Sequence, residues 1–410
     1  MPRNNLIVAL ILLTFFVISF LTNILGALNP NVSSSYTLSE TMAGFLPFAF
    51  FIAYGLVSIP SGLLVERYGE KRMMVVGFVL AFAGALLFAL VPRFDVFLVS
   101  LFTIGAGMAA LQVVINPLLR VAGGEEHFAF TSVMAQLVFG LASFVSPQMY
   151  SYLVTNINQG NLDKPFIGTL AGLVPAGLSW VSLYWVFAIV SLLMIGVIWL
   201  VRFPRVELKE DERVGSRASF AELLGNPYVW LFFLGIFAYV GTEQGISFWM
   251  SKYLSTYHGF DPETAGADSV SYFWGLMTVG GVINLLLMKV FDAKLLLRLF
   301  SLLAMGCVLA GLLGGAQVSF WGFAASGLFL SVMYPAIISL GLNSVARHHG
   351  SFAGILMTGI AGGAVVQLLI GGLSDLTSLH TGMFFLFVTL GYILSIGFWA
   401  RPLVRNKTIV

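Results

Sequence analysis

Charged side chains are scarce in this chain of 410 residues. Asp, Glu, Lys and Arg together make up 9% of the sequence, whereas soluble domains carry roughly 25%. Hydrophobic residues make up 59%, and the mean hydropathy is +0.95. This composition excludes a water-soluble fold. The formal net charge of +2 gives no reason to expect a nucleic-acid partner.

Cysteine and catalytic motifs are also lacking. The single cysteine, Cys307, excludes a disulfide framework and a thiolate metal cluster. All five histidines fall between the long apolar stretches, which excludes a histidine proton relay across a membrane. No zinc-protease, nucleophile-elbow or phosphate-loop motif occurs. We therefore expect no enzymatic activity, no cofactor and no metal site.

Long apolar runs are what the sequence has instead. About 20 mainly apolar residues cross a bilayer as a helix, and twelve such stretches occur. They lie near residues 6–28, 41–64, 72–91, 95–120, 128–154, 180–202, 228–256, 264–288, 294–314, 317–343, 350–376 and 381–401. A charged segment separates two sets of six, which predicts an N-terminal half (1–202), a linker (203–226) and a C-terminal half (227–410). The sequence therefore predicts an all-α protein that spans the lipid bilayer.

Lys and Arg are distributed unevenly between the two sides of this predicted bundle. With twelve spans, seventeen of them fall on the side of the linker and both termini, and only Arg93, Lys164 and Lys252 fall on the other. Positively charged loops stay in the cytoplasm. We therefore predict a cytoplasmic linker and termini, with outward loops near residues 29–40, 155–179 and 257–263. The short loops favour a bacterial inner membrane.

The segment after the second span carries a loop motif. Residues 62–72 read Gly-Leu-Leu-Val-Glu-Arg-Tyr-Gly-Glu-Lys-Arg, which resembles the motif G-x-x-x-D-R-x-G-R-K/R of the major facilitator superfamily. The layout of two six-helix halves is also typical of that superfamily. The resemblance implies that the loop contacts a neighbouring helix end and releases it as the halves rock, and it implies this role for Gly62, Glu66, Arg67, Gly69, Lys71 and Arg72. The alternative is a charged cytoplasmic turn whose basic residues only reflect the excess of Lys and Arg on that side of the membrane.

Two prolines stand at matching places in the halves. Pro117 follows a polar and apolar run in the fourth span, and Pro335 follows a corresponding run in the tenth. Each proline removes a backbone hydrogen bond and bends its helix. We therefore expect kinks at equivalent places, as two halves that pivot about a central site would need.

Several segments resemble the fucose permease family of sugar–cation symporters more closely. They are residues 111–117, 239–244, 274–275, 331–341, 357–363 and 372–375. The pairing of Gln112 with Glu243 favours the branch that transports glucose, galactose and N-acetylglucosamine. The chain departs from the family where Gly26 replaces an acid of helix 1 and Gly281 replaces an arginine of helix 8.

Glu243 is the acid that falls near the middle of a predicted span. An ionisable group in the hydrocarbon is costly, so it is a functional candidate by default. Tyr239, Glu243 and Ser247 share one helix face because they are spaced by four residues. In an apolar cavity the neutral carboxyl is favoured, which would let Glu243 load and release protons. The alternative is a protonated glutamate that only packs two helices.

Neutral polar side chains indicate an uncharged, hydroxyl-rich substrate. An amide offers both a donor and an acceptor, and a tryptophan could stack on the apolar face of a sugar. In the family that this chain resembles, helices 1, 4, 5, 7, 8 and 10 build the central site. We therefore expect substrate contacts from Asn23, Gln112, Asn116, Gln136, Gln244, Trp249, Trp274 and Tyr334. The alternatives are interhelical hydrogen bonds and interfacial aromatic side chains.

These observations favour a secondary active transporter that imports a monosaccharide or a related polar solute by alternating access. The coupling cation would be a proton, carried by Glu243, or sodium, and we expect the protein to act as a monomer. Facilitative uniport and efflux of a small amphipathic compound remain alternatives. An intramembrane enzyme is a further alternative, although the sequence offers no catalytic dyad for it.

Overall fold

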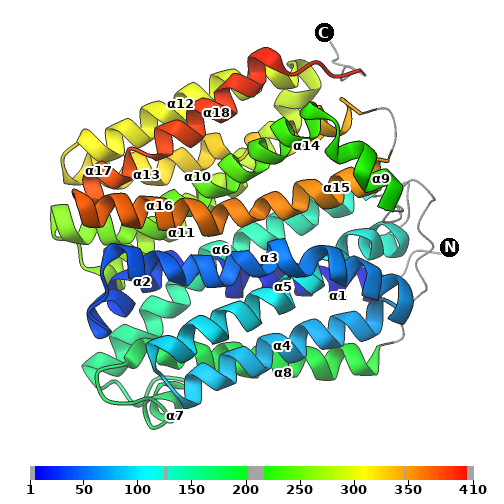
Figure 1. Ribbon diagram of the computed structural model, residues 1–410. Coiled ribbons are helices and arrows are strands. Elements are labelled where there is room, and N and C mark those ends of the chain that lie inside the picture. Colours follow the sequence, from blue (N-terminus) through cyan, green and yellow to red (C-terminus); the bar gives the residue numbers. More distant parts are fainter. Residues whose placement is uncertain (1–4, 124–127, 202, 204–216, 346–347, 404–410) are drawn as a thin grey trace.

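The computed structural model describes residues 5–123, 128–201, 203, 217–345 and 348–403. Regular structure within these residues is helical throughout, with no strand. In this described part of the chain, twelve helices are long and apolar enough to cross a membrane. They coincide with the twelve predicted stretches, and the all-α prediction is confirmed (Figure 1).

Six of these helices form the N-terminal half. They are α1 (Asn5–Thr22) with α2 (Leu25–Ser35), α3 (Glu40–Tyr68), α4 (Glu70–Leu90), α5 (Phe94–Gly123), α6 (Phe128–Gln159) and α8 (Ser182–Leu200). A short helix, α7 (Ile167–Ala171), lies in the connection between α6 and α8. The pairs α3 with α5, α4 with α5, α4 with α8 and α1 with α6 pack together and build this half.

The C-terminal half repeats this arrangement after the short helix α9 (Arg217–Leu224). Its spans are α10 (Pro227–His258), α11 (Ala267–Val290), α12 (Ala293–Leu313), α13 (Ala316–Leu330) with α14 (Met333–Leu342), α15 (His349–Thr358) with α16 (Gly362–Leu376), and α17 (Leu379–Met383) with α18 (Leu386–Trp399). The contacts of α11 and α12 with α13, and of α12 with α18, hold this half together.

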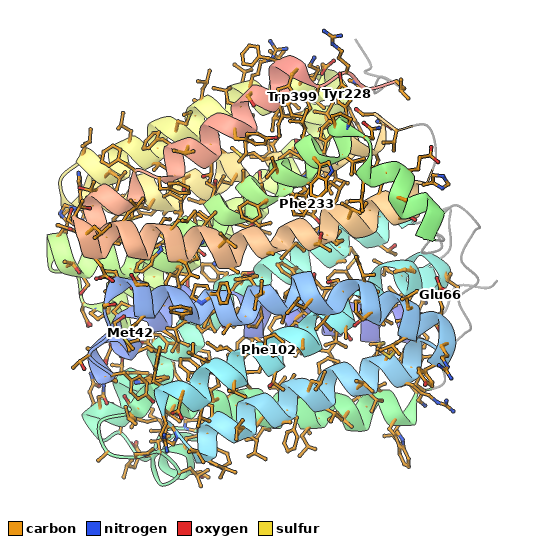
Figure 2. All side chains as sticks on the ribbon, in the orientation of Figure 1. Met42, Glu66, Phe102, Tyr228, Phe233 and Trp399 are labelled. Carbon is orange, nitrogen blue, oxygen red and sulfur yellow. The ribbon has the colours of Figure 1, made fainter. Side chains whose placement is uncertain are left out.

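The two ends of the bundle can be told apart by what they carry. Helix α8 finishes and α9 begins at the end where α1 starts and α18 stops, which we call the linker end (Figure 1). The opposite end, with α2, α7 and α17, is the far end (Figure 1). Along α3, Glu66 marks the linker end and Met42 the far end (Figure 2).

Large apolar side chains project from the outside of the bundle (Figure 2). Leu193 of α8, Leu286 of α11 and Leu302 of α12 are 63%, 65% and 55% exposed. A soluble protein would bury such side chains, because each one left in water forfeits about 1.5–3 kcal/mol of burial free energy. Their exposure fits a surface that faces lipid, so the chain is an integral membrane protein.

One predicted loop is wrong. Residues 29–35 were expected to form part of an outward loop, but they belong to α2, which contains Pro30. The polar side chains of this segment find partners in the fold: Asn29 donates to the Phe248 carbonyl (3.0 Å), and Ser33 donates to Asn29 Oδ1 (3.0 Å). Tertiary contacts therefore keep helical a segment whose composition is typical of a turn.

Several spans are interrupted near their middle. Residues 331–332 form a turn between α13 and α14, and Pro335 lies three residues beyond this turn. Pro117, its counterpart, lies inside α5, which remains one continuous helix. Residues 23–24 divide α1 from α2, and a short 3-10 turn (Gly359–Ala361) divides α15 from α16. The tenth span is thus interrupted close to Pro335, whereas the bend expected at Pro117 stays a prediction, because a bent helix can remain continuous.

The two halves meet through three sets of helices. Helix α16 packs against α3, α10 packs against α2, and α11 packs against α6. Figure 1 shows α3 and α16 side by side at the boundary. At one of these contacts Gly26 lies so close to the carbonyl of Ser247 that a Cβ on residue 26 would overlap it. The absence of a side chain at residue 26 is therefore what lets α2 and α10 approach.

Candidate functional site

Helix α10 carries the acid that the sequence singled out. The helix begins after Asn226, whose side chain accepts from the Tyr228 N–H (3.0 Å), with Pro227 in the first helical position. Both residues are typical of a helix start. Glu243 lies near the middle of the helix and is partly exposed. Tyr239, one turn away, and Gln244 are its polar neighbours.

An aromatic side chain from a second helix completes this group. The rings of Tyr239 and Tyr334 lie 5.6 Å apart, and the Tyr334 hydroxyl donates to Met357 Sδ (3.7 Å). Tyr334 lies in α14, two residues beyond the interruption of the tenth span. Helices α10, α14 and α15 thus bring Tyr239, Glu243, Tyr334 and Met357 together, and we call these four residues the Glu243 cluster.

Gln244 and Trp249 are two further predicted substrate residues on α10, and both are buried. Gln244 is 7% exposed and lies against Glu243. Trp249 is fully buried, and its Nε1 donates to Gln367 Oε1 (3.0 Å). The Gln367 amide in turn donates to the Gly241 carbonyl (3.2 Å). In this structure Trp249 and Gln367 thus join α10 to α16, a contact that leaves the predicted substrate role of Trp249 untested.

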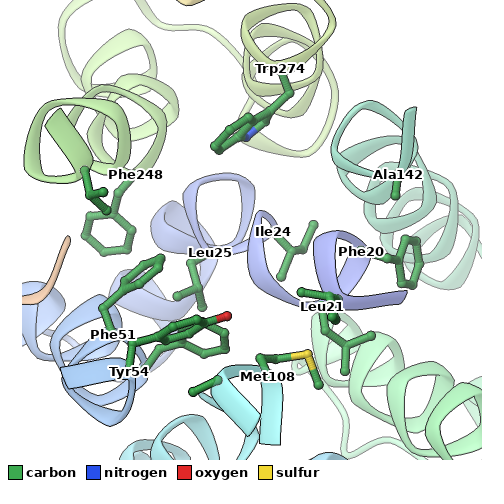
Figure 3. Close-up of a cluster of buried hydrophobic side chains, with 14 of the residues drawn as sticks. Phe20, Leu21, Ile24, Leu25, Phe51, Tyr54, Met108, Ala142, Phe248 and Trp274 are labelled. Carbon is green, nitrogen blue, oxygen red and sulfur yellow. The ribbon is translucent and has the colours of Figure 1, made fainter. Parts of the chain in front are cut away.

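Trp274 of α11 has a different environment. Its side chain is 3% exposed, and its Nε1 has no hydrogen-bond partner among the described residues. Figure 3 shows the indole pointing toward the middle of a cluster that also contains Ile24 and Phe248. A buried donor without a partner is costly, so this indole is suited to receive an acceptor from a bound molecule.

The middle of the molecule is closed on one side by apolar side chains from both halves. Leu25 and Phe51 come from the N-terminal half, whereas Phe248 comes from α10 of the C-terminal half (Figure 3). All three are at most 6% exposed. Ser247, the neighbour of Phe248, is one helical turn beyond Glu243 toward the far end. An apolar layer therefore lies on the far side of the Glu243 cluster.

Asn23 lies at the interruption between α1 and α2. Its Nδ2 donates to Ser143 Oγ (2.8 Å) and to Ser19 Oγ (3.4 Å), and the two serine hydroxyls are 2.6 Å apart. Ser146, farther along α6, donates to the Phe20 carbonyl (2.7 Å). These bonds join α1 to α6 inside one half, so the interhelical alternative describes Asn23 better than a substrate contact does.

The remaining predicted amides lie on α5 and α6. Gln112 is half-buried on α5, and the side chain of Asn116 lies outside the described part of the structure. Gln136 is exposed on α6, one turn from Gly140, which packs directly against Thr278 of α11. Gln136 is therefore on the α6 face that turns toward the other half.

The loop motif contacts the end of α8 through Lys71. Gly69 adopts a φ of +83° between α3 and α4, a conformation that glycine tolerates without strain. The Lys71 ammonium donates to the carbonyls of Trp199 (2.8 Å) and Val201 (2.7 Å) at the end of α8. The Arg67 guanidinium lies over the ring of Tyr68. Within the described residues, the motif thus ties α4 to α8 inside the N-terminal half.

Two residues that contribute to this region were not predicted. Met357 belongs to a segment that was recognised, but nothing in the sequence distinguished its thioether from a packing side chain. Gln367 is a polar residue in the apolar run of α16 and is fully buried. Its isolation in that run was the available signal. Among the described residues, no group of three or more His, Cys, Asp or Glu side chains is arranged to hold a metal ion.

Comparisons with known proteins agree with this architecture. The chain is 29% identical over 386 residues to the glucose/galactose transporter of Brucella abortus biovar 1 (strain 9-941), covering 93% of this chain and 90% of the relative. It is 26% identical over 381 residues to the L-fucose-proton symporter of Escherichia coli (strain K12), covering 90% and 86%. These are relatives of the kind that the resemblance predicted.

Solved structures share the fold. The crystal structure of a major facilitator transporter, FucP, in the outward conformation covers 96% of this chain and 98% of its own, with a TM-score of 0.68 and 24% identity. A bacterial homolog of the human lysosomal transporter Spinster, inward-facing and unoccupied, covers 98% and 97%, with a TM-score of 0.80 and 15% identity. The family model for the Major Facilitator Superfamily matches residues 11–368. The chain therefore belongs to the Major Facilitator Superfamily, and it is a membrane transporter rather than an enzyme.

Proposed function

We propose that this chain imports a monosaccharide or a closely related uncharged solute through a central site next to Glu243. The observation that carries the proposal is the Glu243 cluster. It puts one carboxyl group and two phenol rings near the middle of the bundle. Two relatives, a glucose/galactose transporter and an L-fucose-proton symporter, support a sugar as the substrate.

The polar groups near the centre suit hydroxyl groups. Gln112, Asn116, Gln136 and Gln244 are proposed to line one cavity between the halves, with the unpartnered Trp274 indole as a further donor. Amides can donate to and accept from the same hydroxyl. Tyr334 and Trp274 offer aromatic faces for the apolar side of a sugar ring. In this proposal Asn23 and Trp249 support the site through packing only.

Coupling to protons is proposed to run through Glu243. A carboxyl group that is partly exposed in a largely apolar surrounding can exchange between its neutral and charged forms as the halves move. A phenol hydroxyl and an amide lie beside it and can adapt to either form. The glycine at residue 26, where the resembling family has an acid, favours facilitative uniport as the second candidate. Sodium coupling and efflux of an amphipathic compound are further outcomes that the transport experiment distinguishes.

The bundle is proposed to lie in a bacterial inner membrane with its linker end in the cytoplasm. The distribution of Lys and Arg supports this orientation. The proposed division is 1–202, 203–226 and 227–410, with one chain as the working unit. Under this orientation the apolar layer beyond Glu243 closes the outward side, so the structure represents a state that is closed to the outside.

Transport by the purified protein tests the proposal. The chain is reconstituted in proteoliposomes and given a panel of labelled monosaccharides under imposed proton or sodium gradients. Accumulation of a sugar on a proton gradient is the expected result. Accumulation on sodium alone moves Glu243 to another role, and equilibration without accumulation identifies a uniporter. If no sugar is transported while an amphipathic cation or drug is, the substrate proposal is wrong.

A further inference from the structure

The far end of α3 is held by an acid from the other half. The backbone N–H groups of Glu40 and Thr41, the first two residues of α3, donate to the two carboxylate oxygens of Asp375 (2.8 and 2.9 Å). Asp375 lies in α16 of the C-terminal half. The first N–H groups of a helix have no partner within it, and negative charge is favoured there. Asp375 of the C-terminal half therefore caps a helix of the N-terminal half.

Glu40, the first residue of α3, is also bound by a side chain of α10. The carboxylate of Glu40 pairs with the Lys252 ammonium at 2.6 Å, and Lys252 also donates to Ser33 Oγ of α2 (3.2 Å). The Lys252 side chain is 13% exposed and the Glu40 side chain 24%, which limits the screening of this ion pair by water and salt. Residue 40 is thus bound through its backbone by α16 and through its side chain by α10.

Close backbone approach accompanies these polar contacts. A Cβ at Gly371 of α16 would meet the Glu40 carbonyl, and a Cβ at Gly44 of α3 would meet the Gln367 carbonyl. Nearby, Glu263 accepts from Asn31 and from Asn158 of the N-terminal half, each at 3.1 Å. The charged contacts thus form where the two halves are already in contact. If the halves separated at the far end, each of these contacts would have to break.

We propose that Glu40, Lys252 and Asp375 form a gate that holds the far end closed and sets how often it opens. We call these three residues the far-end gate. The segment that carries Asp375 was recognised in the sequence as a resemblance without a role, and the gate gives it one. The gate rests on alternating access, as the superfamily implies, but on no particular substrate or coupling ion.

Distances between spin labels on the two halves test the gate without any substrate. Labels are placed at Gln159→Cys and Thr256→Cys, exposed positions at the far ends of α6 and α10, in a Cys307→Ser background. Because Asp375→Ala removes two hydrogen bonds to a charged group, it should raise the ratio of open to closed molecules about tenfold or more. Lys252→Glu should act in the same direction.

Two further variants make the result specific. Exchanging the charges in the double variant Glu40→Lys, Lys252→Glu should restore the closed population that Lys252→Glu loses. The matched control is Asp95→Ala, because Asp95 pairs with Arg93 within one half and is largely exposed. The gate is wrong if Asp375→Ala and Lys252→Glu fold normally, as judged by thermal melting, but leave the distance distribution unchanged. It is also wrong if Asp95→Ala shifts the distribution equally, or if the charge exchange restores nothing. Failure of sugar transport in the wild type would leave these outcomes unaffected.

Discussion

Lys71 and Lys294 make the same contact in the two halves. Lys71, near the start of α4, donates to the carbonyls that end α8, and Lys294, at the start of α12, donates to the Ala400 carbonyl just after α18 (2.8 Å). In each half the third span thus holds the end of the sixth. A cation at the negative end of a helix is favourable. This correspondence is what two parallel, structurally related halves predict.

Removal of this contact should weaken one half at a time. Lys71→Ala and Lys294→Ala should each lower the free energy of unfolding by about 1.5–3 kcal/mol, because each removes a charged hydrogen bond to helix-end carbonyls. We expect a lower melting temperature in detergent for both variants, and roughly additive losses in the double variant because the sites are far apart. Arg72→Ala, which removes a neighbouring positive charge, is the control. Equal losses in all three single variants would point to net charge rather than to the helix ends.

Alanine variants of the proposed substrate amides should reduce affinity. Truncation of an amide that contacts a sugar hydroxyl leaves a polar group unpaired, which costs about 1–3 kcal/mol, or roughly tenfold or more in affinity. We expect a raised KM for Gln112→Ala, Asn116→Ala, Gln136→Ala and Gln244→Ala, measured by initial uptake rates.

The structure supplies a contrast for these variants. The side chains of Asn23 and Trp249 are hydrogen-bonded within their own halves. Asn23→Ala and Trp249→Phe should therefore lower the melting temperature and leave KM near the wild-type value. Normal affinity in all four amide variants, with normal expression, would place the site elsewhere. A larger rise in KM for Trp249→Phe than for Gln244→Ala would make Trp249 the substrate contact and Gln244 the packing residue.

Hydropathy and charge were sufficient to predict the twelve spans, because each span must satisfy its own backbone in lipid. They could not predict what depends on a partner across the fold. Trp249 is read from the sequence as an aromatic side chain near a polar face, and only the presence of Gln367 shows why it is buried. Residues 29–35 have a turn-like composition, and only the contact with Phe248 explains their helix.

The orientation of the bundle can be measured directly. Single cysteines at Ser216, in the linker, and at Asn161, beyond α6, are introduced into the Cys307→Ser background. A membrane-impermeant maleimide should label Asn161→Cys in intact cells and Ser216→Cys only after the membrane is opened, because Lys and Arg concentrate on the linker side. Labelling of both cysteines from the same side would contradict the twelve-span topology. Labelling in the reverse order would keep the spans and invert the orientation.

The coupling role of Glu243 separates two kinds of transport. Glu243→Gln mimics the permanently neutral carboxyl, so it should abolish accumulation driven by a proton gradient. It should preserve exchange of labelled for unlabelled sugar, which needs no net proton movement. Asp95→Asn, a change at an exposed acid, is the control and should behave as the wild type. Proton-driven accumulation that survives in Glu243→Gln would remove this residue from the coupling mechanism.

Gly26 should be required only when the far end is closed. A side chain at residue 26 would overlap the Ser247 carbonyl, so Gly26→Val should prevent α2 and α10 from packing together. We expect the Gln159 and Thr256 spin-label pair to shift to long distances and transport to stop, while the folded protein still elutes as a single species in detergent. Gly391→Val is the matched control, because a Cβ at Gly391 meets no atom within 4 Å. Full transport by Gly26→Val would show that the halves need not approach this closely, and that glycine stands in place of the family's acid for another reason.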